Sequence, residues 1–157
     1  MANEKQLKDA KKVYETLCAA LDANDWKYKK HDDDLVITFL TRGDDIPMQF
    51  IVAIDADRQL VRMLSPLPFK FVEEKRVEAA VALCQTNYSL VDGSFELDLS
   101  DGEVSFKLTS SFKDCLISAD LLKFMVMYAC VVVDKYNDSL LMLNTGKLSI
   151  DEYFEKI

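Results

Sequence analysis

Hydrophobic and polar positions change their period along the chain, and these changes predict the secondary structure. Residues 4–23 carry apolar side chains at spacings of three and four, as on one face of an α-helix. Residues 26–64 instead alternate in short segments separated by polar turns, which predicts an antiparallel β-meander. Further helices are expected at about 72–87, at 119–143 and from Ser149 onward. This order predicts an α+β fold with an antiparallel sheet packed against helices.

The meander can be tested by pairing its strands across four-residue turns. Every facing pair on one side of the sheet is then apolar, whereas a slip of one residue would turn a strand to the wrong face. The chain at Ser65–Pro68 is expected to leave the sheet, because proline has no N–H to donate. The expected strands are 26–30, 35–41, 47–54 and 60–64. The expected pairs are Trp26–Phe39, Tyr28–Ile37, Leu35–Val52, Ile37–Phe50, Phe39–Met48, Val52–Val61 and Phe50–Met63.

A hairpin is expected in the run FELDLSDGEVSF at residues 95–106. Asp101-Gly102 between alternating segments predicts a two-residue type I′ turn. That turn would place Leu99 opposite Val104 and Glu96 opposite Lys107. The four-strand meander and this Asp-Gly hairpin together make up the predicted sheet.

The helix expected at 119–143 is apolar on nearly all sides between Leu121 and Val133. Such a helix must be buried all round. Either it lies between the sheet and the first helix, or part of it forms a homodimer or partner surface, for which Met125 and Met127 are suited. A helix of about 25 residues spans roughly 38 Å, more than the ~30 Å expected for the molecule. A bend is therefore expected near residues 134–137.

Two shorter apolar segments have open interpretations. Pro66, Pro68, Phe69 and Phe71 form an apolar loop. Either Phe69 and Phe71 hold the second helix to the sheet or, if exposed, the loop contacts a partner. The second helix is expected to pack through its most apolar side. That side carries Val77, Ala80, Val81 and Cys84.

Composition narrows the classes of partner. The chain has 157 residues, which predicts a single domain over residues 1–157, and its net charge is -8. This charge argues against nucleic acid and against an anionic membrane surface, since both favour basic proteins. The N-terminal MANEKQLKDAKK has no apolar core, and no apolar stretch reaches the ~20 residues that span a bilayer. We therefore expect a cytoplasmic protein.

Candidate chemistry is sparse. Aspartates at the meander turns could bind a divalent ion, but successive turns lie at opposite ends of the sheet and aspartate is common in turns. His31 is the single histidine, in a loop beside three aspartates. The four cysteines have no paired spacing typical of zinc sites, and no Gly-rich phosphate loop or GxSxG motif occurs. The sequence predicts no catalytic residue, no cofactor and no metal ligand.

The hairpin and the helix starts resemble a known family. The run GSFELDLSDGEVSF at residues 93–106 resembles the hairpin of the YbjN-like family, described as bacterial sensory transduction regulators. The helix start at Ser118 and the segment from Gly146 to Glu152 are also similar to that family, over about residues 7–157 in all. The resemblance implies a fold like that of type III secretion chaperones, which are small, acidic and usually homodimeric. It implies no catalytic residues.

These observations favour a non-enzymatic module that binds a protein partner in a regulatory or chaperone-like role. A small-molecule or divalent-ion sensing domain is the alternative, suggested by the family description and the aspartate-rich turns. The expected partner-facing residues are Pro66, Phe69, Phe71, Met125 and Met127.

Overall fold

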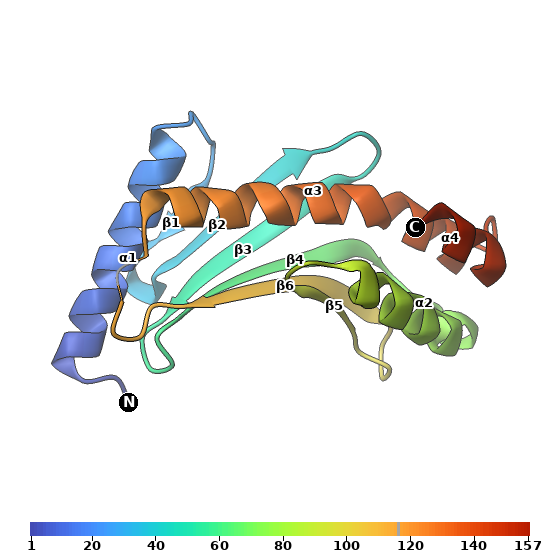
Figure 1. Ribbon diagram of the computed structural model, residues 1–157, viewed down its shortest axis with the longest axis horizontal. Helices are drawn as coiled ribbons and strands as arrows, with labels where there is room; N and C mark the ends of the chain where they lie inside the picture. The colour runs from blue at the N-terminus through green and yellow to red at the C-terminus, as the bar shows by residue number, and fades with distance from the viewer. Residues whose placement is uncertain (116) are drawn as a thin grey trace.

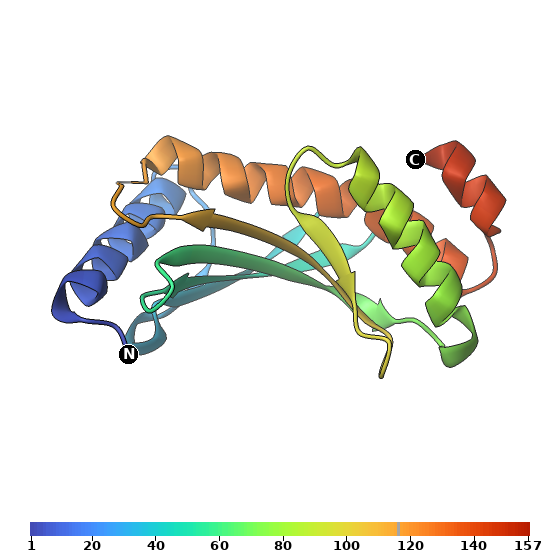
Figure 2. The same ribbon diagram turned by 60° about the horizontal axis from the view of Figure 1, so that its bottom comes forward.

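The computed structural model describes residues 1–115 and 117–157 and has a six-stranded antiparallel sheet with helices on one face (Figures 1 and 2). The strand order is β1-β2-β3-β4-β6-β5. Helix α3 lies along the covered face, with α1 at one end and α2 and α4 at the other. The predicted α+β class is confirmed. The strands are β1 (Lys29–His31), β2 (Val36–Arg42), β3 (Pro47–Asp55), β4 (Leu60–Lys70), β5 (Ser94–Leu97) and β6 (Glu103–Ser111). The helices are α1 (Glu4–Asp22), α2 (Arg76–Ser89), α3 (Ala119–Asn144) and α4 (Ile150–Lys156), with 3₁₀ turns η1 (Asp32–Asp34) and η2 (Glu73–Lys75).

Helix α1 begins at a capping box and buries the predicted face. Asn3 accepts a hydrogen bond from the Gln6 backbone, and the Gln6 side chain accepts one from the Asn3 N–H. This exchange satisfies backbone donors that a helix start otherwise leaves open. Tyr14 and Leu17 are buried at 5% and 1% exposure. Local sequence and packing therefore agree in this helix.

The strand register differs from the predicted one by two residues throughout the meander. Ile37 lies opposite Val52 rather than Phe50, and Val52 lies opposite Met63 rather than Val61. Each turn keeps four residues but begins and ends one residue later than expected, so the strand before it gains a residue and the one after it does not. A displacement of two preserves the face of every side chain, which is why the predicted core face is confirmed although the predicted partners are not.

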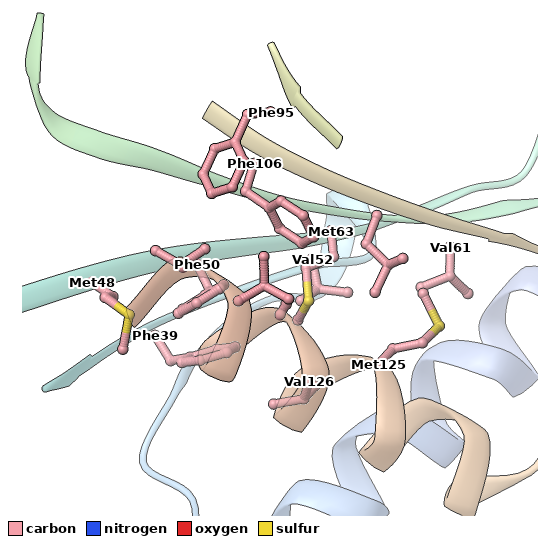
Figure 3. Packing of buried hydrophobic residues seen from close by; sticks show 14 of the residues in the cluster. Phe39, Met48, Phe50, Val52, Val61, Met63, Phe95, Phe106, Met125 and Val126 are labelled. Atoms are coloured by element: carbon pink, nitrogen blue, oxygen red, sulfur yellow. The ribbon is translucent and has the colours of Figure 1, made fainter. Parts of the chain in front are cut away.

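The core lies between that face of the sheet and α3 (Figure 3). The rings of Phe39 and Phe50 stack on neighbouring strands with centroids 5.0 Å apart. Met125 of α3 reaches toward Val61 of β4, whereas Val126 lies beside Leu17 of α1; the two are 4% and 2% exposed. Aromatic and branched side chains from both layers thus form one cluster.

Strand β4 continues through two prolines, so the prediction that the chain leaves the sheet at Ser65 is wrong. β4 includes Pro66 and Pro68, and β6 pairs with it up to Lys70 across a register shift. The pairing with β3 ends at Leu64. Beyond that residue one side of β4 is unpaired among the described residues, and such an edge tolerates proline.

The β5–β6 hairpin exists, but its turn is longer than the predicted two residues. Leu97 pairs with Val104, and β5 ends at Leu97 while β6 begins at Glu103, so the five residues 98–102 connect the strands. The Asp98 carboxylate accepts hydrogen bonds from the Ser100 N–H and hydroxyl at 2.8 and 2.6 Å. The Gly102 N–H donates to the Asp98 carbonyl at 2.7 Å. A side-chain turn centred on Asp98 therefore replaces the type I′ turn.

Helix α2 buries the side opposite to the predicted one. Val77 and Val81 are 75% and 51% exposed, and Cys84 is exposed as well. The inward side chains are small, which allows α2 to approach the sheet closely. The free energy gained from this close packing exceeds what the burial of the larger valines would give. The buried residues are Ala79, Ala82, Leu83 and Thr86.

Helix α3 is continuous over Ala119–Asn144, so the bend expected near residues 134–137 does not occur. A helix of 26 residues spans about 39 Å, and the molecule is elongated along it (Figure 1). Within residues 1–115 and 117–157, every helix is too short or too polar to cross a membrane.

Candidate partner-binding surface

The outward side of α3 carries large apolar side chains that the rest of the molecule leaves uncovered. The sheet and α1 cover only the opposite side, where Leu122, Val126 and Ala129 are fully buried. Exposed clusters of this kind mark interaction sites more often than isolated apolar residues do. We name these residues the α3 outer face. They are Leu121, Phe124, Met127 and Val131, with exposures of 40%, 56%, 45% and 63%.

Two sets of contacts hold the first half of α3 in place. The Ser118 side chain accepts a hydrogen bond from the Leu121 N–H at 3.1 Å and caps the helix. The Phe124 ring stacks on Tyr128, with centroids 5.8 Å apart. The Tyr128 hydroxyl donates to the Asp92 carbonyl and accepts from the Asp92 N–H, both at 3.0 Å. The α3 outer face is therefore fixed to the α2–β5 connection.

A third contact fixes the middle of α3 to the β2–β3 turn. The Asp134 carboxylate accepts a hydrogen bond from the Asp44 N–H at 3.0 Å. A Cβ at Gly43 would lie 1.6 Å from the Asp134 carboxylate, so any larger residue there would displace this side chain from its contact. Two segments far apart in the sequence are thereby held together.

The five residues expected to face a partner lie in different environments. Met127 belongs to the α3 outer face. Met125, 4% exposed, and Phe71, 1% exposed, are instead buried in the core of this structure. Met125 lies two residues from Met127, roughly 200° around the helix, and Phe71 turns inward because β4 continues to Lys70. Pro66 and Phe69 are half-buried along β4.

In the acidic β3–β4 turn, an internal contact occupies the Asp55 carboxylate. The Asp55 carboxylate accepts hydrogen bonds from the Arg58 N–H and guanidinium, both at 2.9 Å. The backbone hydrogen bond lowers the pKa of Asp55. In the described part of the chain, no group of three or more His, Cys, Asp or Glu side chains is placed to hold a metal ion.

His31 and the cysteines do not form a nucleophile–base pair within residues 1–115 and 117–157. His31 is exposed, with Nε2 3.3 Å from the Thr38 hydroxyl. Burial raises the pKa of the Cys130 thiol to about 12, which keeps it protonated and unreactive. Cys18 is buried, and Cys84 and Cys115 are exposed on the surface.

A groove of about 490 Å³ lies between α1 and β1. The Tyr14 hydroxyl donates to the Asp32 carboxylate at 2.9 Å, and the Tyr28 hydroxyl donates to Asp22 at 2.8 Å. Burial raises the pKa of both tyrosines well above the usual value. These polar groups are paired with one another. They therefore link β1 to α1 and are not available to bind a ligand.

The fold and its exposed helix face define a class: a small α+β protein with an antiparallel sheet covered on one side and a preformed apolar surface on its longest helix. The family model of YbjN, described as "Putative bacterial sensory transduction regulator", matches residues 14–142. The chain therefore belongs to the YbjN family.

Two solved structures have similar folds. One is titled "Crystal structure of YbjN, a putative transcription regulator from E. coli"; it has a TM-score of 0.60 and 12% identity, covering 80% of this chain and 92% of that one. The other is "Structure of the HopA1-SchA Chaperone-Effector Complex", with a TM-score of 0.59 and 12% identity over 88% of this chain and 99% of that one. At such identity the likeness shows the fold alone. A comparison with curated proteins finds no match.

Proposed function

We propose that this protein is a non-enzymatic module that binds a polypeptide partner in a regulatory or chaperone-like role. The observation that carries the proposal is the α3 outer face, whose four large apolar side chains are 40% to 63% exposed. Complete burial of a fully exposed side chain of this kind contributes about 1.5–3 kcal/mol, and each of these half-exposed side chains can contribute roughly half of that. A partner that covers the face therefore gains substantial free energy.

The rigidity of the face supports binding. Ser118, Tyr128 and Asp134 hold α3 through contacts with its N-terminus, the α2–β5 connection and the β2–β3 turn. A preformed surface loses little conformational entropy on association. Met127 lies at the edge of the face that borders α1, and its flexible side chain can adapt to different partner shapes.

The chemistry of the face indicates the class of partner. It spans Leu121 to Val131, which is about 15 Å along the helix and matches a short apolar segment of a polypeptide. The net charge of -8 favours a segment flanked by lysine or arginine. The likeness to a chaperone–effector complex, and the family's description as a regulator, are consistent with this class of partner.

Native mass spectrometry of the protein, gently purified from its own host, tests the proposal. The wild type is expected to retain a discrete polypeptide, and Phe124→Ser/Val131→Ser is expected to lose it. Leu40→Ser is the matched control, because Leu40 is 75% exposed on the other face of the sheet. A protein without a retained polypeptide, or equal retention by all three proteins, contradicts the proposal.

A further inference from the structure

A narrow cleft separates α1 from the first turns of α3, where the two helices cross (Figures 1 and 2). We name it the α1–α3 cleft. Ala20 of α1 is a small side chain at this crossing, so the two helix surfaces do not interlock fully. The polar side chains that line the cleft are Asn24 and Lys123. The apolar lining residues are Leu17, Ala20, Leu21, Trp26, Val126 and Met127.

The α1–α3 cleft has the size of a site for one side chain. It encloses about 230 Å³ of open space, whereas pockets for small molecules have roughly 300–1,000 Å³. Its apolar walls offer few hydrogen-bond partners to water. An apolar group that enters the cleft therefore removes apolar surface from water, which favours binding.

The cleft is continuous with the α3 outer face. Met127 belongs to both, because it is 45% exposed on the face and also lines the cleft. Lys123 lies four residues before Met127 and therefore on the same side of α3. A polypeptide that covers the α3 outer face thus passes the mouth of the cleft.

Lys123 gives the mouth of the cleft a positive charge. Its side chain is exposed and takes part in none of the ion pairs among residues 1–115 and 117–157. Asp120 lies one turn before it, and in the same part of the chain the two do not form an ion pair. The net charge of the whole chain favours a basic segment, whereas the charge at this point favours an acidic side chain.

We propose that the α1–α3 cleft holds one apolar side chain of the polypeptide partner, and that an acidic residue beside this side chain pairs with Lys123. The assignment rests on the proposed function and names the residues of the partner that are recognised. An anchor that fills a pocket contributes much of the affinity of an interface. An exposed ion pair adds little affinity and mainly selects among partners.

Selection of short random peptides tests the assignment on the wild-type chain. The peptides are displayed on phage and contain no tryptophan. Leucine, methionine or phenylalanine next to aspartate or glutamate is expected to be enriched. The same selection on Lys123→Glu should enrich lysine or arginine beside the anchor instead, because the charge at the mouth is reversed. The same preference on both proteins overturns the role of Lys123.

Ala20→Leu tests the cleft itself, because the larger side chain fills it. The dissociation constant of a selected peptide, measured by fluorescence anisotropy, is expected to rise about tenfold or more. Ala19→Leu is the matched control, since Ala19 is exposed one residue earlier on the same helix and should leave the constant unchanged. Urea unfolding checks that both variants are folded. Equal binding by Ala20→Leu and the wild type overturns the anchor site.

Trp26 provides a measurement that needs no variant. It is the single tryptophan of the chain and is half-buried in the cleft, with its ring edge-on to Phe39 at 5.1 Å. A selected peptide is expected to shift its fluorescence to shorter wavelengths, because the anchor excludes water from the indole. A bound peptide that leaves this emission unchanged overturns the cleft but leaves the proposed function intact. A chain that selects no peptide contradicts both.

Discussion

Two asparagines contribute to the stability of the fold in opposite directions, because one is hydrogen-bonded and the other is not. Asn87 of α2 bonds the N–H and the carbonyl of Phe95 at the edge of the sheet. Asn137 of α3 is 0% exposed, and neither atom of its side-chain amide has a hydrogen-bond partner among the described residues. A buried amide without partners costs free energy, whereas a bonded amide stabilises the fold.

Replacing each asparagine by leucine, which has the same number of side-chain heavy atoms, is predicted to have opposite effects. Asn137→Leu should raise the free energy of unfolding by about 1 kcal/mol, because it removes an unpaired amide. Asn87→Leu should lower it by about 1–3 kcal/mol, because the polar groups of Phe95 lose their partners. Urea unfolding measures both values. A loss of stability in Asn137→Leu as large as that in Asn87→Leu contradicts the assignment.

Gly102 has a steric role that Gly146 does not share. Both have positive φ, +81° and +71°. A Cβ at Gly102 would lie 2.1 Å from the Phe71 carbonyl oxygen, whereas nothing lies within 4 Å of one at Gly146. Gly146→Ala should cost about 1–2 kcal/mol, the cost of a left-handed backbone. Gly102→Ala should cost more, because the Phe71 backbone must also move. Equal costs in urea unfolding would refute the close approach.

At the scale of elements, a hydrogen bond between two side chains joins α4 to α2. The sequence predicts both helices but not this contact. Tyr153 of α4 is 0% exposed, and its hydroxyl lies 2.6 Å from that of Thr86 on α2. Burial raises the pKa of Tyr153 to about 12. The contact between the last helix and α2 therefore depends on a protonated phenol.

This contact predicts a dependence of stability on pH. An unfolded tyrosine ionises near pH 10, whereas Tyr153 in the folded protein does so near pH 12. The contribution of Tyr153 is therefore complete below pH 10 and is lost between pH 10 and 12, by up to about 1.4 kcal/mol per pH unit. Tyr153→Phe should be about 1 kcal/mol less stable at pH 7 but lose stability less steeply above pH 10. Parallel slopes in urea unfolding at pH 9–11.5 would argue against the buried phenol.

Sequence reasoning predicts the elements well where one face alone is apolar. The meander strands alternate strictly, so the core face is correct even though Ile37 pairs with Val52 rather than Phe50. Reasoning fails in α2, where both sides are apolar and close packing of Ala79 and Ala82 decides which one is buried. The sequence pattern also gives the wrong end for β4. The two prolines do not reveal that the pairing with β3 stops at Leu64 while β4 continues to Lys70.

At the scale of the whole molecule, the covering of α3 depends on packing that local patterns do not contain. An all-round apolar helix predicts either complete burial or a partner surface, and only the arrangement of α1 and the sheet shows which sides remain open. The sequence pattern predicts Met127 as a partner-facing residue, whereas the exposure of Phe124 and Val131 is seen only in the structure. The molecule thus presents a rigid apolar ridge, the α3 outer face, which we assign to a polypeptide partner.

Photo-cross-linking in the native host tests the proposed partner surface most directly. A photoreactive amino acid is placed in turn at Met127 on the α3 outer face and at Leu40 on the open face of the sheet. Position 127 is expected to link a discrete foreign polypeptide, and position 40 is expected to link none. The absence of a foreign polypeptide at position 127, or the same product from positions 127 and 40, would contradict the proposed surface.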